Sequence, residues 1–348
     1  MEHRAFRPQW WLRSTHSQSI LPSLPVRRLL IERRTRGWRR ASRELLLDCG
    51  DGVTLQAFHS STHAAQDSAA QCVEPALAVL LHGWEGSAES QYILSLADVL
   101  LARGCDVIRL NLRDHGDTHH LNRDLFHSCR LPEVVGAMQR LQELFPARRR
   151  VLIGYSLGGN FMLRVAAEAP QAGLDIERVI AVSALLDPAT TLDAIENGLW
   201  IYHSYFVMKW TRSLMRKQAA WPDTYRFGKL LRSRNLRRMT EDLVLQHTDY
   251  PDLHSYLRDY AITGERLAGL TVPSTIVTAL DDPMIAPADL ERLADTPLLR
   301  VVTTQTGGHC GFLEDLGSHS WVDDFILREL EQAGLLPHTT AAIRAHAR

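Results

Sequence analysis

Residues 154–159 read Gly154-Tyr155-Ser156-Leu157-Gly158-Gly159, between a predicted strand at Arg150–Tyr155 and a predicted helix at Gly158–Ala169. A serine on so tight a turn has strained backbone angles, and side chains in place of the flanking glycines would collide with the adjoining strand and helix. A GxSxG pattern in this strand-turn-helix setting is typical of a nucleophilic serine. The competing interpretation is a glycine-rich helix start with an ordinary N-terminal serine.

Strands and helices alternate on both sides of this turn. We expect strands at Leu45–Leu47, Val53–Phe58, Leu77–Leu81, Asp106–Leu112, Arg150–Tyr155, Val179–Ser183, Ser274–Leu280 and Leu299–Thr304. Further helices are predicted at Ser90–Ala102, Pro132–Phe145 and Ser320–Ala333. The alternation indicates an α/β fold whose mostly parallel central sheet is flanked by helices.

An interruption of the strand pattern divides the chain. Residues 187–264 show helical and irregular stretches without a convincing strand, whereas the strands on both sides read as one sheet. We therefore predict a helical cap at 187–264, inserted into a core of residues 44–186 and 265–335. We further expect an N-terminal extension at 1–43 on or near the core, a C-terminal tail at 336–348 and a flexible surface loop at Thr62–Cys72.

The composition is that of an ordinary globular protein, with 45% hydrophobic residues and 39 Lys and Arg against 40 Asp and Glu. The near-zero net charge argues against nucleic acid as a partner, because such binding depends on a positive field. Residues 1–48 are nevertheless basic, with 11 Arg against 4 acidic residues. This end is compatible with a solvated face that pairs with the acidic body, and also with peripheral contact to an anionic membrane.

Two sequence features bear on the compartment. No apolar run approaches the roughly 18 residues of a membrane-spanning helix, and the N-terminus does not show a signal peptide. The five cysteines are widely spaced without a CxxC pair, which argues against a disulfide framework or a zinc ribbon. We expect a cytoplasmic protein with reduced cysteines, and the oligomeric state stays open.

A serine nucleophile needs an adjacent base and a third group that orients the base. Both follow the inserted segment: Asp281-Asp282-Pro283 comes directly after one strand, and His309 lies in a glycine-rich loop after the next. We predict His309 as the base, the alternative being a surface-loop histidine. Asp282 is favoured as the third group because an Asp-Pro step commonly opens this loop, and Asp281 stays a candidate.

Acyl transfer also requires hydrogen-bond donors for a developing oxyanion. We expect these to be the backbone N–H groups of Leu157, directly after the serine, and of Trp84. Trp84 lies in the loop His82-Gly83-Trp84-Glu85-Gly86-Ser87, which follows the third strand. His82 is interpreted as a structural residue that holds this loop.

Several motifs support a resemblance beyond the serine turn. They are His16-Ser17-Gln18-Ser19-Ile20-Leu21-Pro22, residues 82–87, Asn111-Leu112-Arg113-Asp114-His115-Gly116-Asp117-Thr118, residues 154–160, Asp282 and Gly308-His309-Cys310-Gly311-Phe312. With these motifs the chain resembles the α/β-hydrolase superfamily from about residue 6 to 330. More narrowly, it resembles the YheT-like hydrolases, which are related to embryogenesis-associated hydrolases and yeast medium-chain fatty-acid ethyl ester synthase/esterases.

The resemblance implies an esterase or acyltransferase that acts on lipid-like or medium-chain esters. The chain departs from the family pattern at Ser19, where threonine is usual. It departs again at Asp114-His115, where a small or glycine-containing loop is usual. Neither departure touches the three residues predicted for the nucleophile, its base and the orienting acid.

Aromatic residues are concentrated in the predicted cap. We expect Trp200, Tyr205 and Phe206 to form an apolar wall of a substrate pocket, the alternative being that these rings form the core of the cap. Histidines and carboxylates also gather between Asp114 and His127, without the fixed spacing of a metal site. We therefore expect neither a metal ion nor a cofactor.

The sequence thus predicts a serine hydrolase that acts on carboxylic esters through Ser156, His309, Asp282 and an acyl-enzyme. The expected partner is a small-molecule ester or lipid with a medium-chain or lipid-like acyl group. Two alternatives remain. One is an acyltransferase that forms esters by alcoholysis on the same three residues, and the other is a non-catalytic lipid-binding protein on the same fold.

Overall fold

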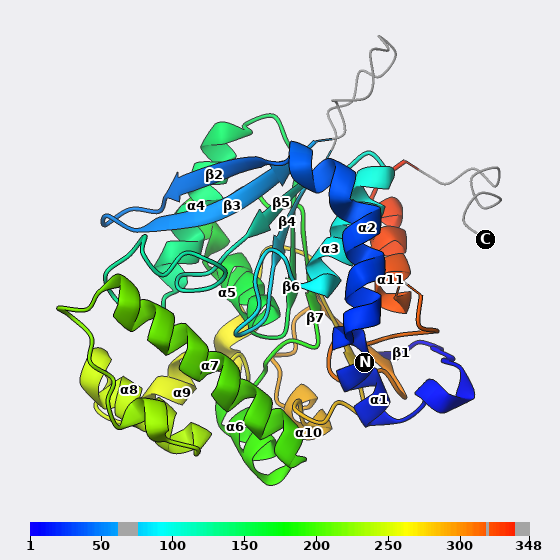
Figure 1. Cartoon of the computed structure of the whole chain (residues 1–348). Coiled ribbons are helices and arrows are strands. Elements are labelled where there is room, and N and C mark those ends of the chain that lie inside the picture. The colour runs from blue at the N-terminus through cyan, green and yellow to red at the C-terminus, as the bar shows by residue number, and fades with distance from the viewer. Residues whose placement is uncertain (62–75, 318–319, 338–348) are drawn as a thin grey trace.

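The computed structural model describes residues 1–61, 76–317 and 320–337, and a twisted sheet runs through its centre (Figure 1). The strands are β1 (Glu2–His3), β2 (Arg43–Asp48), β3 (Thr54–Ser60), β4 (Leu77–Leu81), β5 (Asp106–Leu110), β6 (Arg150–Tyr155), β7 (Arg178–Val182), β8 (Ser274–Ala279) and β9 (Leu299–Thr304). Among the described residues their order is β1-β9-β8-β7-β6-β4-β5-β3-β2. β3 is antiparallel to its neighbours β2 and β5, and the other pairs are parallel. The predicted α/β fold with a mostly parallel sheet is confirmed.

Each predicted strand overlaps an observed one. The observed strand β1 was not predicted from the sequence. β1 pairs with β9, with Glu2 opposite Val302. Two residues at the edge of a sheet carry no periodicity, so no pattern could have identified them. The predicted loop Thr62–Cys72 and residues 338–348 of the predicted tail lie outside the described residues.

β4 shows why helices cover the sheet on both faces. Its odd-numbered residues belong to one hydrophobic core and its even-numbered residues to another, and all five are fully buried. Because successive side chains of a strand point to opposite faces, such a strand requires cover on both. One face packs against α4 (Leu131–Leu144) and α5 (Leu157–Ala172), and the other against α3 (Gln91–Ala102) and α11 (Trp321–Gln332).

The residues before β2 fold against the core. They form η1 (Trp10–Leu12), α1 (Thr15–Ile20), η2 (Leu21–Ser23) and α2 (Pro25–Ala41). α2 lies on α3, where Trp38 Nε1 donates to the Asp98 carboxylate at 2.8 Å and Arg34 pairs with the same carboxylate at 2.8 Å. Part of the basic end therefore pairs with acidic residues of the body.

Helices α6 to α9 follow β7 and lie together beyond one end of the sheet, at the lower left of Figure 1. Their bounds, with the short helix η4 among them, are α6 (Pro188–Asn197), α7 (Trp200–Ala220), η4 (Leu230–Arg232), α8 (Leu236–His247) and α9 (Leu253–Asp259). The short helix η5 (Glu265–Leu267) precedes β8, and α10 (Pro287–Leu290) lies between β8 and β9. We call α6–α9 the cap helices. In the described part of the chain, no helix combines the length and apolar character needed to cross a membrane.

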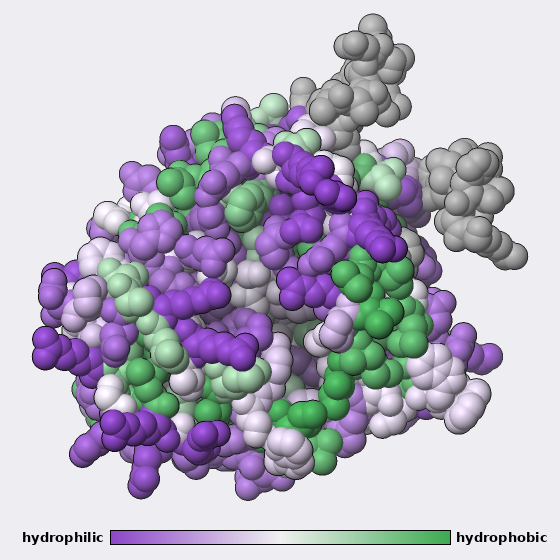
Figure 2. Space-filling model, viewed as in Figure 1, coloured by the Kyte–Doolittle hydropathy of each residue, from purple (hydrophilic) through white to green (hydrophobic). Residues whose placement is uncertain are grey.

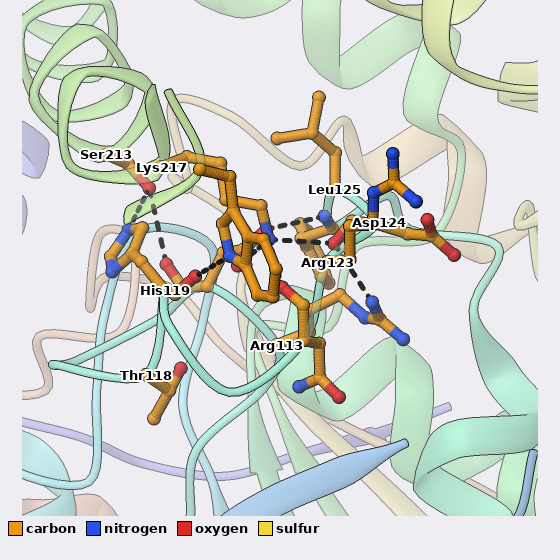
Figure 3. Close-up of polar contacts among 12 residues, drawn as sticks. Arg113, Thr118, His119, Arg123, Asp124, Leu125, Ser213 and Lys217 are labelled. Carbon is orange, nitrogen blue, oxygen red and sulfur yellow. Dashed lines mark hydrogen bonds and ion pairs between the residues drawn. The ribbon is translucent and has the colours of Figure 1, made fainter. Parts of the chain in front are cut away.

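A buried lysine ties the cap helices to the core. Lys217 Nζ on α7 donates to Asp114 Oδ1 at 2.8 Å and to the backbone oxygens of Asn122 and Asp124 at 2.7 and 2.9 Å (Figure 3). The two side chains of the ion pair are 1% and 4% exposed. Burial lowers the pKa of Lys217 and raises the pKa of Asp114, so each charge depends on the other.

Lys217→Ala is expected to lower the free energy of unfolding by about 3–5 kcal/mol, because it leaves the Asp114 carboxylate buried without its partner. Arg216→Ala is the matched control on the same helix. Its pair with Asp117 is exposed, at 61% and 94%, and its loss should cost less than about 1 kcal/mol. Urea denaturation measures both values, and equal losses would contradict the anchoring role of Lys217.

Candidate active site

Ser156 occupies the turn between β6 and α5, with a φ of 52° and a ψ of −118°. A Cβ at Gly158 would lie 2.4 Å from the carbonyl oxygen of Leu81, and one at Gly154 would lie 2.3 Å from that of Gly158. Glycine therefore permits the close contact between the helix start and the strands that this strained backbone requires. The serine hydroxyl is held at the carboxyl end of β6.

His309 lies between Ser156 and Asp282. Its Nε2 is 3.0 Å from Ser156 Oγ, and its Nδ1 is 2.9 and 3.2 Å from the two carboxylate oxygens of Asp282. The loops after β8 and β9 carry the aspartate and the histidine, as the sequence predicts. When Nδ1–H donates to the carboxylate, the lone pair of Nε2 faces the serine hydroxyl. This is the arrangement in which an imidazole can remove the serine proton.

The two neighbouring aspartates make different contacts. Asp282 is buried, and its Oδ1 also accepts two backbone N–H groups of its own loop, at 2.9 and 3.2 Å. Asp281 instead accepts from the Thr15 hydroxyl at 3.0 Å and from the Gly308 N–H at 2.9 Å. Asp282 therefore orients the imidazole of His309, and Asp281 holds the loop that carries it.

Helix α1 crosses the His309 loop and supports it from outside. Ser19 Oγ accepts the backbone N–H of His309 at 3.0 Å. The buried Gln18 side chain donates to the carbonyl oxygen of Leu313 at 2.9 Å and accepts its N–H at 2.7 Å. A Cβ at Gly311 would lie only 2.0 Å from the Gln18 carbonyl oxygen, so this crossing requires glycine. The sequence identified residues 16–22 only through a family resemblance and assigned them no role.

Hydrogen bonds also hold the loop after β4. The hydroxyl of Tyr92 accepts the Gly83 N–H at 3.0 Å. His82 Nε2 accepts the Leu112 N–H at 3.2 Å, so its Nδ1 carries the proton and donates to the Gly83 carbonyl oxygen at 2.8 Å. Burial keeps the pKa of His82 well below its ordinary value. This histidine is therefore neutral and structural, as predicted.

The two backbone groups predicted as oxyanion donors are Trp84 N–H and Leu157 N–H. Within residues 1–61, 76–317 and 320–337, neither donates a hydrogen bond to another group of the chain. Leu157 is the first residue of α5, where backbone N–H groups lack intrahelical partners and carry the positive end of the helix dipole. Both groups can therefore donate to a bound ligand.

Helix α7 packs on the same loop. The Trp84 ring stacks on Phe206, with ring centroids 5.3 Å apart, and meets Trp210 edge-on at 5.3 Å. Lys209 Nζ donates to the Glu85 carbonyl oxygen at 3.0 Å. The cap helices therefore influence the position of the Trp84 N–H.

The three predicted pocket residues lie in different surroundings. Phe206 contacts Trp84, and Tyr205 packs edge-on against Phe206. Trp200 is 74% exposed at the start of α7, so its prediction as a pocket wall is wrong. Composition alone does not show which side of a helix faces the core, and this residue lies on the outer side.

The histidine- and carboxylate-rich stretch after β5 is used mainly for packing. Asp114 pairs with Lys217, and His119 Nε2 lies 2.9 Å from Ser213 Oγ of α7 (Figure 3). Burial lowers the pKa of His119 to about 3, which keeps the ring neutral. Among the described residues, no group of three or more His, Cys, Asp or Glu side chains is arranged to hold a metal ion.

Comparison with known proteins adds independent findings. A family model described as alpha/beta hydrolase fold matches residues 78–316. The Escherichia coli (strain K12) protein YheT, named as a candidate esterase, is 26% identical over 313 residues, which are 88% of this chain and 87% of that protein. The Saccharomyces cerevisiae (strain ATCC 204508 / S288c) medium-chain fatty acid ethyl ester synthase/esterase 2 is 22% identical over 285 residues, which are 72% of this chain and 60% of that protein.

Solved structures show the same fold at low sequence identity. The Pyrococcus furiosus esterase Pf2001 superposes with a TM-score of 0.54 at 14% identity, covering 84% of this chain and 91% of that chain. This likeness concerns the fold alone.

The contact between Asp282 and His309 predicts a change in the pKa of the imidazole. Burial would lower this pKa, but the adjacent Asp282 carboxylate outweighs burial, and the pKa of His309 lies well above its ordinary value. Asp282→Asn should lower it by about 1 to 3 pH units, because burial then acts without the opposing charge. An NMR titration of the His309 ring measures this value.

Asp281→Asn is the matched control, because it removes a carboxylate one residue away that does not contact the ring. It should change the pKa of His309 less than Asp282→Asn does. Equal changes would show that the ring senses both charges alike and would contradict the separate assignments of the two aspartates.

Proposed function

Because this chain belongs to the alpha/beta hydrolase fold family, we propose that it is an esterase that cleaves carboxylic esters through Ser156, His309 and Asp282. One observation carries this proposal. The serine hydroxyl, the imidazole and the carboxylate are joined by contacts of 3.0 and 2.9 Å at the turn where the backbone is strained. The relatives named as esterases support the same class of reaction.

The first half of the reaction transfers the acyl group to the enzyme. Ser156 Oγ attacks the ester carbonyl carbon while His309 Nε2 takes the hydroxyl proton, and the carbonyl oxygen becomes an oxyanion. Leu157 and Trp84 N–H groups stabilise this oxyanion, and each such donor is typically worth about 3 kcal/mol of barrier. His309 then gives its proton to the leaving oxygen, so the alcohol departs and the acyl group stays on Ser156.

The second half releases the acid. Water attacks the acyl carbon as His309 takes one of its protons, and the same ring then returns that proton to Ser156 Oγ. Asp282 stays ionised throughout, holding Nδ1–H and stabilising the imidazolium. An alcohol in place of water would form a new ester. The relative named as a synthase/esterase supports this second outcome.

The apolar rings beside the oxyanion loop support a substrate with an acyl chain. Trp84, Phe206 and Trp210 form a continuous aromatic group, and Tyr205 extends it toward solvent. Apolar walls with few polar groups are typical of sites for lipid-like ligands. We therefore assign a medium-chain or lipid-like ester as the substrate class.

A fluorophosphonate probe is expected to label the wild-type protein, because an activated serine attacks its phosphorus. Ser156→Ala should abolish labelling, and Asp282→Asn should slow it by about 10⁴-fold, the loss typical of an imidazole held in the wrong tautomer. Ser255→Ala, on α9, is the control and should label like the wild type. Gel fluorescence and mass spectrometry of the labelled peptide measure the result.

Persistent labelling of Ser156→Ala would place the nucleophile elsewhere. A wild-type protein that binds lipid but neither reacts with the probe nor cleaves any ester would favour the non-catalytic lipid-binding alternative.

Nitrophenyl esters of increasing chain length should be cleaved with rising kcat/KM from acetate to octanoate. Octanoate has six methylenes more than acetate, and each buried methylene is worth about 0.8 kcal/mol, so full burial would give up to about 3,000-fold. Phe206→Ala should flatten this rise, whereas Met215→Ala, exposed on the same helix, should not. A preference for acetate would contradict the acyl-chain site. Adding ethanol and measuring ethyl ester against free acid separates transfer from hydrolysis.

A further inference from the structure

Large apolar side chains are exposed where α2 and α7 begin. Figure 2 shows hydrophobic side chains gathered over the N-terminal part of α2 and below it toward α7. Of the fifteen large apolar side chains that are exposed among the described residues, six come from these two helix starts, and they are 38–74% exposed. We call these six the apolar rim: Val26, Leu29, Leu30, Leu199, Trp200 and Ile201.

The two halves of the apolar rim are neighbours in space. His16 Nδ1 of α1 lies 2.9 Å from the hydroxyl of Tyr202 on α7, and their ring centroids are 5.9 Å apart. α2 follows α1 after a turn of a few residues. The same short helix reaches the candidate active site, since Ser19 accepts the His309 N–H. The apolar rim therefore lies next to the elements that hold the imidazole.

On the solvent face of α2, the exposed apolar residues are followed by exposed arginines. Arg33, Arg36 and Arg40 are exposed and follow the apolar residues of α2 at helical spacing. In the described part of the chain, none of these three makes a hydrogen bond or an ion pair, whereas Arg34 pairs with Asp98. Guanidinium groups bind phosphate oxygens well, so these three are available for anionic groups outside the chain.

We propose that the apolar rim and these three arginines form a docking surface for an anionic lipid bilayer. The apolar side chains enter the boundary between headgroups and acyl chains, where tryptophan is favoured, and the arginines bind lipid phosphates. A second copy of this chain fits less well. A two-fold interface on this surface would place six unpaired arginines in one interface, and their like charges repel.

Vesicle flotation tests this surface in the Ser156→Ala background, so that lipid turnover plays no part. The protein should float with phosphatidylcholine vesicles that contain phosphatidylglycerol, and much less with phosphatidylcholine alone. Raised salt should weaken the binding. Replacing Arg33, Arg36 and Arg40 by Gln should weaken binding to the anionic vesicles on the order of 100-fold.

The apolar contribution has its own variants. Val26→Ser, Leu29→Ser and Trp200→Ser combined should reduce vesicle binding at least about tenfold. Leu46→Ser with Leu245→Ser is the matched control, because these side chains are similarly exposed, at 59% and 54%, on β2 and α8. The control should bind like the parent, and circular dichroism checks that both variants are folded.

Three outcomes would overturn the proposal. In the first, the protein floats with neither kind of vesicle. In the second, the apolar-rim variant binds vesicles as well as its control does. In the third, light scattering shows that the apolar-rim substitutions convert a dimer to a monomer and vesicle binding does not change. The last would assign the apolar rim to self-association. Each outcome leaves the esterase proposal intact, because that proposal is measured with nitrophenyl esters in the absence of vesicles.

Discussion

The site depends on how closely the helix after Ser156 approaches the neighbouring strand. At Gly158 no side chain fits, because the Leu81 carbonyl oxygen occupies the space. The strained serine backbone is held by its neighbours: its N–H donates to the Val182 carbonyl oxygen at 2.9 Å, and its own carbonyl oxygen accepts the Leu185 N–H at 3.2 Å. The central sheet therefore fixes the direction of the Ser156 hydroxyl, which a flexible surface turn would not do.

The groups around that hydroxyl come from three parts of the chain. The loops after β8 and β9 supply the carboxylate and the imidazole, and α1 holds the second loop through Ser19 and Gln18. The cap helices contact the loop after β4, where Phe206 packs on Trp84. Supporting contacts of this kind keep reacting groups in a productive geometry. The extension and the cap are thus both connected to the site.

The sequence predicts some of these features because they follow from local rules. Strand and helix periods, and the positions of Ser156, Asp282 and His309 after strands, were enough to predict the fold and the residues that meet. The resemblance to YheT-like α/β-hydrolases is also confirmed. The contact between Lys217 and Asp114 was not predictable, because a buried ion pair between distant segments leaves no local pattern. The exposure of Trp200 was missed for the same reason.

The bonds between Gln18 and Leu313 join residues that are 295 positions apart. At about 5 to 20 residues per second, a ribosome adds the second partner roughly 15 to 60 seconds after the first. Ser156 is added about halfway through that interval, and from then on the nascent chain carries the serine without His309 or the loop that α1 supports. The contacts around Ser156 are therefore completed late in synthesis, after β9 has been added.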